Sequence, residues 1–174
     1  MNYKQLTALC LFTLLLLSCT HKTVFKLVQV PGSFSVSIPA YMAPASDLCP
    51  GRRSAVQYAS DSAEAYLFII DTLRKNMREN NLHSFYDSMV VGNVGDSGMV
   101  QPPARFAILH QDSTLYTERR AMLQSNGVVV FYRIEVVASP SRFYYIQLWT
   151  SLKNKAALKN DFDRILDSFT AVNR

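Results

Sequence analysis

Hydrophobic and polar residues alternate along several short segments of the chain, and a period of two predicts β-strands. In FSVSIP, residues 34–39, the side chains of Phe34, Val36 and Ile38 fall on one face. The segment AYLFIIDTL, residues 65–73, is almost continuously apolar, as expected for a strand in a sheet that is covered on both faces. Further strands are expected at 24–30, 54–60, 105–110 and 143–150.

Two segments instead carry apolar residues at the spacing of one helical face. Residues 82–91 predict a short helix, with Asn80 or Asn81 as its N-cap and Gly92 as its stop. Residues 153–172 predict a longer amphipathic helix. Its apolar stripe consists of Leu158, Phe162, Ile165, Leu166 and Phe169.

A β-hairpin is predicted around Asn126-Gly127, the favoured pair for a two-residue turn. That turn would place Arg120 opposite Arg133 and Glu118 opposite Glu135, with opposite charges as diagonal neighbours. The four side chains would then form a charged cluster on one face. The other face of the hairpin is apolar and is expected to belong to the core; it carries Leu123, Val128, Val130, Tyr132, Ile134 and Val136.

The chain begins with an apolar run, residues 6–17, which is too short to cross a bilayer as a helix of roughly 20 residues. A lysine before such a run is typical of a secretory signal peptide. Its end, Leu16-Leu17-Ser18-Cys19, resembles the lipobox of bacterial lipoproteins, in which the cysteine is acylated and becomes the first residue. We therefore expect a lipoprotein signal peptide at 1–18, a lipidated tether at 19–23 beginning with Cys19, and a single domain at 24–174. An ordinary cleaved signal peptide is the alternative.

Charge and cysteine content exclude some functions. The chain has 18 basic and 13 acidic residues, and its basic residues are scattered rather than arranged in the stripe of a nucleic-acid-binding protein. We therefore expect no nucleic-acid partner. If Cys10 leaves with the signal peptide and Cys19 carries lipid, Cys49 is the remaining thiol and no intrachain disulfide can form.

No pattern of catalytic or metal-binding residues stands out. His21, His83 and His110 are not at metal-ligand spacing with each other. The run Asp161, Asp163, Asp167 lacks the glycine and glutamate of an EF-hand loop, and the segment GNVGDSG lacks the lysine of a phosphate-binding loop. We expect no enzymatic activity, no cofactor and no metal.

Three segments carry a resemblance to a known family: FSVSIP at 34–39, SAVQY leading into AYLFIIDTL, and the C-terminal FYYIQLWTSLKNKAALKNDFDRILDSFTAV. They resemble the Mog1/PsbP-like group, and especially its small, Bacteroidetes-like bacterial lipoproteins of unknown function. The resemblance implies an α+β fold, a single-domain α/β/α sandwich whose mainly antiparallel sheet is flanked by helices. Members include a regulator of a nuclear-transport GTPase and an extrinsic photosynthetic subunit, so the resemblance also implies a noncatalytic binding or accessory role.

A candidate binding surface combines the charged cluster with nearby aromatic residues, since arginine and aromatic residues are favoured at interfaces. Its members are Tyr116, Glu118, Arg120, Phe131, Arg133, Glu135, Tyr144 and Trp149. The alternative is a set of cross-strand ion pairs that keeps a solvent-facing sheet soluble. If an aliphatic helix covers this face, the binding interpretation fails.

Two functional hypotheses remain from the sequence. The first is an envelope lipoprotein, held to the membrane by its lipid, that binds a protein partner as an accessory subunit. It is expected to face the periplasm, because no acidic residues directly follow Cys19. The alternative is a carrier of a small apolar or amphipathic molecule between the sheet and a helix near Phe131, Tyr144 and Trp149, which needs an enclosed pocket of several hundred Å³.

Overall fold

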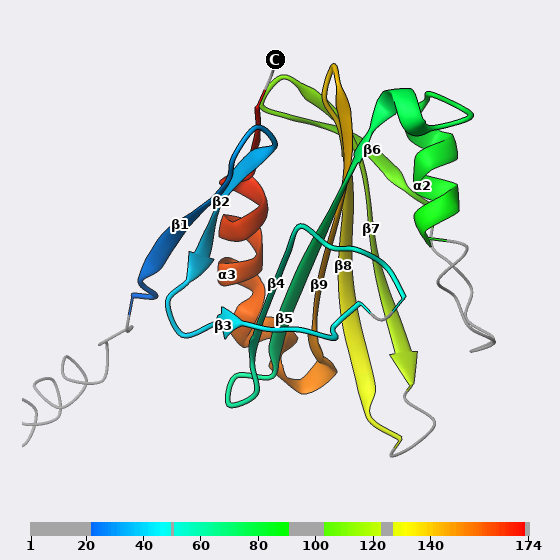
Figure 1. Ribbon diagram of the computed structural model, residues 1–174. Helices are drawn as coiled ribbons and strands as arrows, with labels where there is room; N and C mark the ends of the chain where they lie inside the picture. The colour runs from blue at the N-terminus through cyan, green and yellow to red at the C-terminus, as the bar shows by residue number, and fades with distance from the viewer. Residues whose placement is uncertain (1–21, 50, 91–102, 123–126, 173–174) are drawn as a thin grey trace, which may run out of the picture.

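The computed structural model describes residues 22–49, 51–90, 103–122 and 127–172, which form two antiparallel sheets and two α-helices (Figure 1). The larger sheet has the strand order β3-β4-β5-β9-β8-β7-β6, and the smaller has the order β1-β2-β10. The larger sheet consists of β3 (Ala43–Pro44), β4 (Val56–Ser60), β5 (Ala65–Leu73), β6 (Arg105–Leu109), β7 (Asp112–Met122), β8 (Val129–Ala138) and β9 (Arg142–Ser151). The smaller consists of β1 (Phe25–Val30), β2 (Phe34–Pro39) and β10 (Thr170–Ala171).

The helices lie on opposite faces of the seven-stranded sheet. Helix α3 (Lys155–Asp167) packs between this sheet and the β1–β2 hairpin, whereas α2 (Leu82–Val90) covers part of the other face (Figure 1). Short 3-10 helices, η1 (Arg74–Asn76) and η3 (Leu152–Asn154), follow β5 and β9. The predicted α+β class, with a mainly antiparallel sheet flanked by helices, is confirmed.

Strand β5 shows why the sheet is covered on both sides. Ala65, Leu67 and Ile69 point into the apolar cluster beneath α3, while Phe68 and Ile70 point into the cluster beneath α2. The continuous apolar run predicted this double burial, because an alternating strand would leave one face polar. The two helices therefore pack against opposite faces of the same central strand.

Helix α2 begins where its capping residue predicts. The Asn81 side-chain oxygen accepts a hydrogen bond from the backbone N–H of Ser84 at 2.8 Å, which satisfies one of the free donors of the first turn. The helix is described as far as Val90, and the predicted stop at Gly92 lies outside the described residues.

Helix α3 is shorter than the sequence pattern predicts. It ends at Asp167 rather than near residue 172, and Thr170–Ala171 form β10 beside β2. The Ser168 hydroxyl accepts a hydrogen bond from the backbone N–H of Ser37 at 2.8 Å and donates to the carbonyl of Ile165 at 2.9 Å. This contact with β2 holds the chain at the helix end, and the next residues can then join the small sheet.

The predicted register of the β7–β8 hairpin is wrong by two residues. Met122 lies opposite Val129, whereas the predicted turn would place Gln124 opposite Val129. Gly127 has a φ of 68°, as a turn glycine allows, whereas residues 123–126 lie outside the described part of the chain. A shift of two leaves every side chain on its predicted face, because side chains alternate along a strand.

Candidate functional site

Strands β7 and β8 bring most of the predicted surface residues to one face of the large sheet, the face on which α3 packs. Alternation and register place six of them there: Tyr116, Glu118, Arg120, Phe131, Arg133 and Glu135. Their shared face agrees with the sequence prediction. Their degree of exposure differs widely, however, and this decides which of them can contact a partner.

Glu118 and Arg133 form the centre of the charged cluster. They lie directly opposite each other, and the Glu118 Oε1 accepts a hydrogen bond from the Arg133 guanidinium at 3.0 Å. The sequence predicted instead that Glu118 would face Glu135 and that Arg120 would face Arg133. Both pairings are wrong because of the two-residue register shift.

Helix α3 covers part of this face with its apolar side, over Phe131 and Tyr144, and its polar side adds charged residues to the cluster. Lys155 Nζ lies 2.9 Å from the second carboxylate oxygen of Glu118, and Asp163 Oδ1 lies 3.6 Å from the Arg133 guanidinium. Burial raises the pKa of Glu118, but Lys155 and Arg133 outweigh this effect and hold that pKa below its ordinary value. The cluster therefore ties the polar side of α3 to the sheet.

Glu135, by contrast, is buried and takes no part in an open surface. Its side chain is 6% exposed, and its Oε1 accepts a hydrogen bond from the hydroxyl of Thr114 at 3.0 Å. Desolvation raises the pKa of Glu135, and the hydrogen bond and the charge of Arg133 only partly oppose this. The predicted role of Glu135 as a surface residue is corrected by this burial.

The predicted aromatic residues do not form one surface. Phe131 and Tyr144 belong to the core beneath α3, and Tyr144 is fully buried, with its hydroxyl donating to the carbonyl of Ser33 at 2.8 Å. Trp149 lies on the opposite face of the sheet, stacked on Tyr66. The predicted carrier site between sheet and helix near these three residues is therefore not formed.

The open part of the predicted surface is a hollow of about 280 Å³ beside Tyr116, at the edge of the large sheet. The Arg133 guanidinium lies over the Tyr116 ring, 5.3 Å from its centroid. Arg105 on the edge strand β6 lies opposite Tyr116 and also lines the hollow. The lining consists of Pro103, Arg105, Tyr116, Thr117, Glu118 and Arg133.

Arg105 is the residue that sequence reasoning missed. It joins the hollow because β6 and β7 pair across a short turn at His110, whose φ of 56° reverses the chain without a glycine. Arg105 and Arg120 are both exposed, and neither forms an ion pair with any residue that the structure describes. Counting residues outward from the turn, where Leu109 pairs with Asp112, could have placed Arg105 opposite Tyr116.

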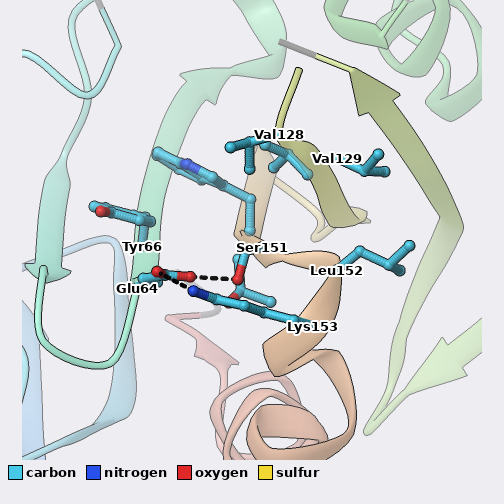
Figure 2. A pocket seen from close by; sticks show the side chains of 10 residues that line it. Glu64, Tyr66, Val128, Val129, Ser151, Leu152 and Lys153 are labelled. Carbon is cyan, nitrogen blue, oxygen red and sulfur yellow. Dashed lines mark hydrogen bonds and ion pairs between the residues drawn. The ribbon is translucent and has the colours of Figure 1, made fainter. Parts of the chain in front are cut away.

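A second, larger hollow lies at the end of the sheet (Figure 2). Its volume is about 580 Å³, and Trp149 and Val128–Val130 line it together with a polar rim at Glu64 and Lys153. Hydrogen bonds from Lys153 and Ser151 hold the pKa of Glu64 below its ordinary value. This hollow contains one of the three residues named for the carrier hypothesis.

Other candidate residues have structural surroundings. Cys49 is half-buried, and burial raises the pKa of its thiol, which makes it a poor nucleophile at neutral pH. His110 Nε2 lies 3.0 Å from the backbone carbonyl of Asp167, and His83 is exposed on α2. Within residues 22–49, 51–90, 103–122 and 127–172, no group of three or more His, Cys, Asp or Glu side chains is placed to hold a metal ion.

The predicted lipidation site, Cys19, lies outside the described residues, as do residues 1–18 and most of the tether. Among the helices that the structure describes, none is long and apolar enough to span a membrane.

The architecture is that of an α+β sandwich, and comparison with solved structures identifies its group. The cyanobacterial PsbP protein of Synechocystis superposes with a TM-score of 0.63 at 12% identity, covering 89% of this chain and 96% of that one. LpqN of Mycobacterium tuberculosis, described as involved in cell envelope biogenesis, gives 0.56 at 13% identity over 87% and 92%. The yeast Ran-binding protein Mog1p gives 0.52 at 11% identity over 87% and 97%.

A crystal structure from Bacteroides thetaiotaomicron gives a TM-score of 0.59 at 12% identity; the match covers 86% of this chain and spans about half (49%) of the other chain. No family model and no curated protein matches the sequence. The chain has the Mog1/PsbP-like fold, as the sequence resemblance predicted. At these identities the likeness shows the fold alone.

Proposed function

We propose that this chain is a noncatalytic accessory protein of a bacterial cell envelope, anchored through lipid on Cys19, that binds an acidic segment of a partner protein. The binding site is the hollow beside Tyr116, between Arg105 and Arg133. The observation that carries the proposal is a pair of exposed cations on the sheet face of the hollow: Arg105 lines the hollow, and Arg120 lies further along β7.

Charge complementarity favours an acidic partner. Around the hollow, Glu118 is already engaged by Arg133 and Lys155, and Asp163 is engaged by Arg133 and Lys159. The paired acids leave the guanidinium groups of Arg105 and Arg120 as the charges available to a partner. Guanidinium groups bind carboxylates through two parallel N–H donors, so acidic side chains are the chemistry they recognise best.

The shape of the site also supports a protein partner rather than a substrate. The hollow is small, polar and open at the sheet edge. The Tyr116 ring forms part of its wall, and the Arg133 guanidinium lies over that ring. A rigid aromatic residue beside arginines is typical of the residues that dominate the energy of an interface. The hollow has room for one or two side chains of a partner protein, but it does not enclose a substrate away from water.

Affinity purification of the lipidated protein from its own envelope after mild crosslinking tests the proposal. The double variant Arg105→Glu/Arg120→Glu is expected to lose a stoichiometric partner that the wild-type protein retains. Arg78→Glu is the matched control, since Arg78 is also exposed but lies in the segment between η1 and α2, outside the hollow. Equal recovery of the partner with all three proteins would contradict the proposed surface.

Salt dependence gives an independent test of the same site. An interaction between exposed guanidinium groups and carboxylates weakens as ionic strength rises, because the Debye length falls to about 3 Å at 1 M salt. Binding by the wild-type protein should therefore fall steeply with salt, and binding that is unaffected by salt would contradict an acidic partner segment.

The envelope location has its own test. If the domain faces the periplasm, protease added to intact cells should leave it uncut, whereas protease added after outer-membrane permeabilisation should digest it. Digestion in intact cells would contradict the periplasmic orientation and leave the lipid anchor and the binding surface unaffected.

A further inference from the structure

The hollow at the end of the large sheet has the size and composition of a ligand pocket. Its volume of about 580 Å³ lies within the range of roughly 300–1,000 Å³ that is typical of small-molecule sites. It shares no lining residue with the hollow beside Tyr116, so it is separate from the proposed partner surface. Figure 2 shows its lining side chains converging from the start of β8, the end of β9 and η3.

The wall of the pocket is aliphatic. Val128, Val129, Val130 and Leu152 line it beside Trp149. Val128 is 40% exposed, which places apolar surface in contact with water at the pocket mouth. Covering such surface with a ligand chain is favourable, at about 25 cal/mol per Å² of apolar area.

Trp149 is held between two rings and offers no free face. The Tyr66 ring stacks on Trp149 with 5.2 Å between ring centroids and an interplanar angle of 16°. The Tyr132 ring lies 6.5 Å from Trp149 between centroids, at an angle of 25°. Strand pairing places these residues on either side of Trp149, on β5 and β8. A flat aromatic ligand therefore cannot stack on the indole, whereas an aliphatic chain can pack along its edge.

The polar rim lies at one end of the pocket and carries an exposed cation, Lys153. Glu64 accepts hydrogen bonds from the Ser151 hydroxyl, from Asn154 Nδ2 at 3.1 Å, and from Lys153 Nζ at 2.8 Å. The Lys153 side chain is 70% exposed. An ammonium group has three donors, so Lys153 can donate to an anionic group in addition to Glu64.

We propose that this pocket binds an amphipathic molecule with a single aliphatic chain and an anionic head group, of the fatty-acid type. The chain lies against Val128, Val130 and the edge of Trp149, and the head group is bound by Lys153. This binding activity goes beyond the accessory role and does not depend on it, because the two sites share no residue.

The chain contains a single tryptophan, so its fluorescence reports on this pocket directly. The full lipidated chain in phosphatidylcholine vesicles would be titrated with terminally brominated dodecanoic acid, because bromine quenches an indole on contact. Saturable quenching of Trp149 is expected. Val128→Asp should abolish it by placing a charge at the pocket mouth, while Val24→Asp, at another exposed valine (71% exposed), should leave it unchanged.

The head-group assignment is tested by Lys153→Gln. This change should weaken binding of the brominated acid by about fivefold, the size expected for one exposed charge pair, and leave binding of the brominated alcohol unchanged. Lys75→Gln, at an exposed lysine in η1, is the matched control. Absence of saturable quenching, or equal quenching in Val128→Asp, would overturn the pocket; equal binding of the acid by Lys153→Gln would overturn the anionic head group.

Discussion

Glu118 on β7 and Arg133 on β8 lie directly opposite each other, and their side chains are joined by a hydrogen-bonded ion pair of 3.0 Å. Lys155 of α3 reaches the same glutamate at 2.9 Å. The pair is partly exposed, and such pairs contribute on the order of 0.2–1 kcal/mol each. The cluster therefore orients the polar side of α3 on the sheet, whereas the apolar core supplies most of the stability.

A double-mutant cycle measures this pair. Replacing Glu118 and Arg133 by Gln, singly and together, should give a coupling energy of about 0.5 kcal/mol in urea unfolding at pH 7. Because the pKa of Glu118 is held below its ordinary value, its contribution is present above about pH 4.3 and is lost as pH falls through the lowered pKa. A coupling that persists at acid pH would contradict an ionic origin.

Glu135 should show the opposite pH dependence. Its pKa is raised by burial, so the folded state holds a proton that the unfolded state has released, and stability falls as pH rises from about 4.3 through the raised pKa. Glu135→Gln keeps an acceptor for Thr114 and should remove this fall, so that the variant gains stability relative to wild type as pH increases. Urea midpoints of unfolding at pH 4 and pH 7 check this. Glu118→Gln should show the opposite trend and lose stability relative to wild type as pH increases.

Tyr144 links the two sheets, and its hydroxyl should matter to stability. It donates to the carbonyl of Ser33 at 2.8 Å in a fully buried position. Tyr144→Phe should lower the free energy of unfolding by about 1 kcal/mol, the usual value for one buried hydrogen bond. Tyr41→Phe, which removes an exposed hydrogen bond to Asp161, is the control and should cost less. Equal losses in the two variants would contradict a special role for the buried contact.

The positions of the longer strands along the chain and the existence of both helices could be predicted from the sequence, because local periodicity indicates them. The end of α3 could not, since it depends on the contact between Ser168 and Ser37 on a strand far away in sequence. The β7–β8 register was misjudged because Asn126-Gly127 indicates a turn but not where pairing resumes. Within the described residues, the pair nearest the turn is Met122 opposite Val129.

The candidate surface was predicted in part. The shared face of Glu118 and Arg133 follows from alternation, whereas the burial of Glu135 and Phe131 follows from where α3 packs, and no local pattern reveals that. The split between Tyr144 and Trp149 was readable, since an odd separation within one strand puts two side chains on opposite faces.

The lipobox predicts that Cys19→Ala releases the protein from the membrane fraction and leaves the precursor uncut. The physical reason is that acyl chains contribute roughly 0.8 kcal/mol per buried methylene, and in the proposed lipoprotein Cys19 would carry all of them. Fractionation of cells followed by mass measurement of the N-terminus checks both effects. A variant that still sediments with membranes and is processed normally would contradict the lipid anchor.

The central claim, that the hollow beside Tyr116 is a partner-binding surface, is tested most directly by site-specific photocrosslinking in living cells. A photoreactive amino acid at Arg120, an exposed position of β7 on the same sheet face as the hollow, should crosslink to one envelope protein, and Arg105→Glu should abolish that product. The same photoreactive residue at Arg78 should give no such product. If position 120 gives no product beyond that seen at position 78, the proposed binding surface is wrong.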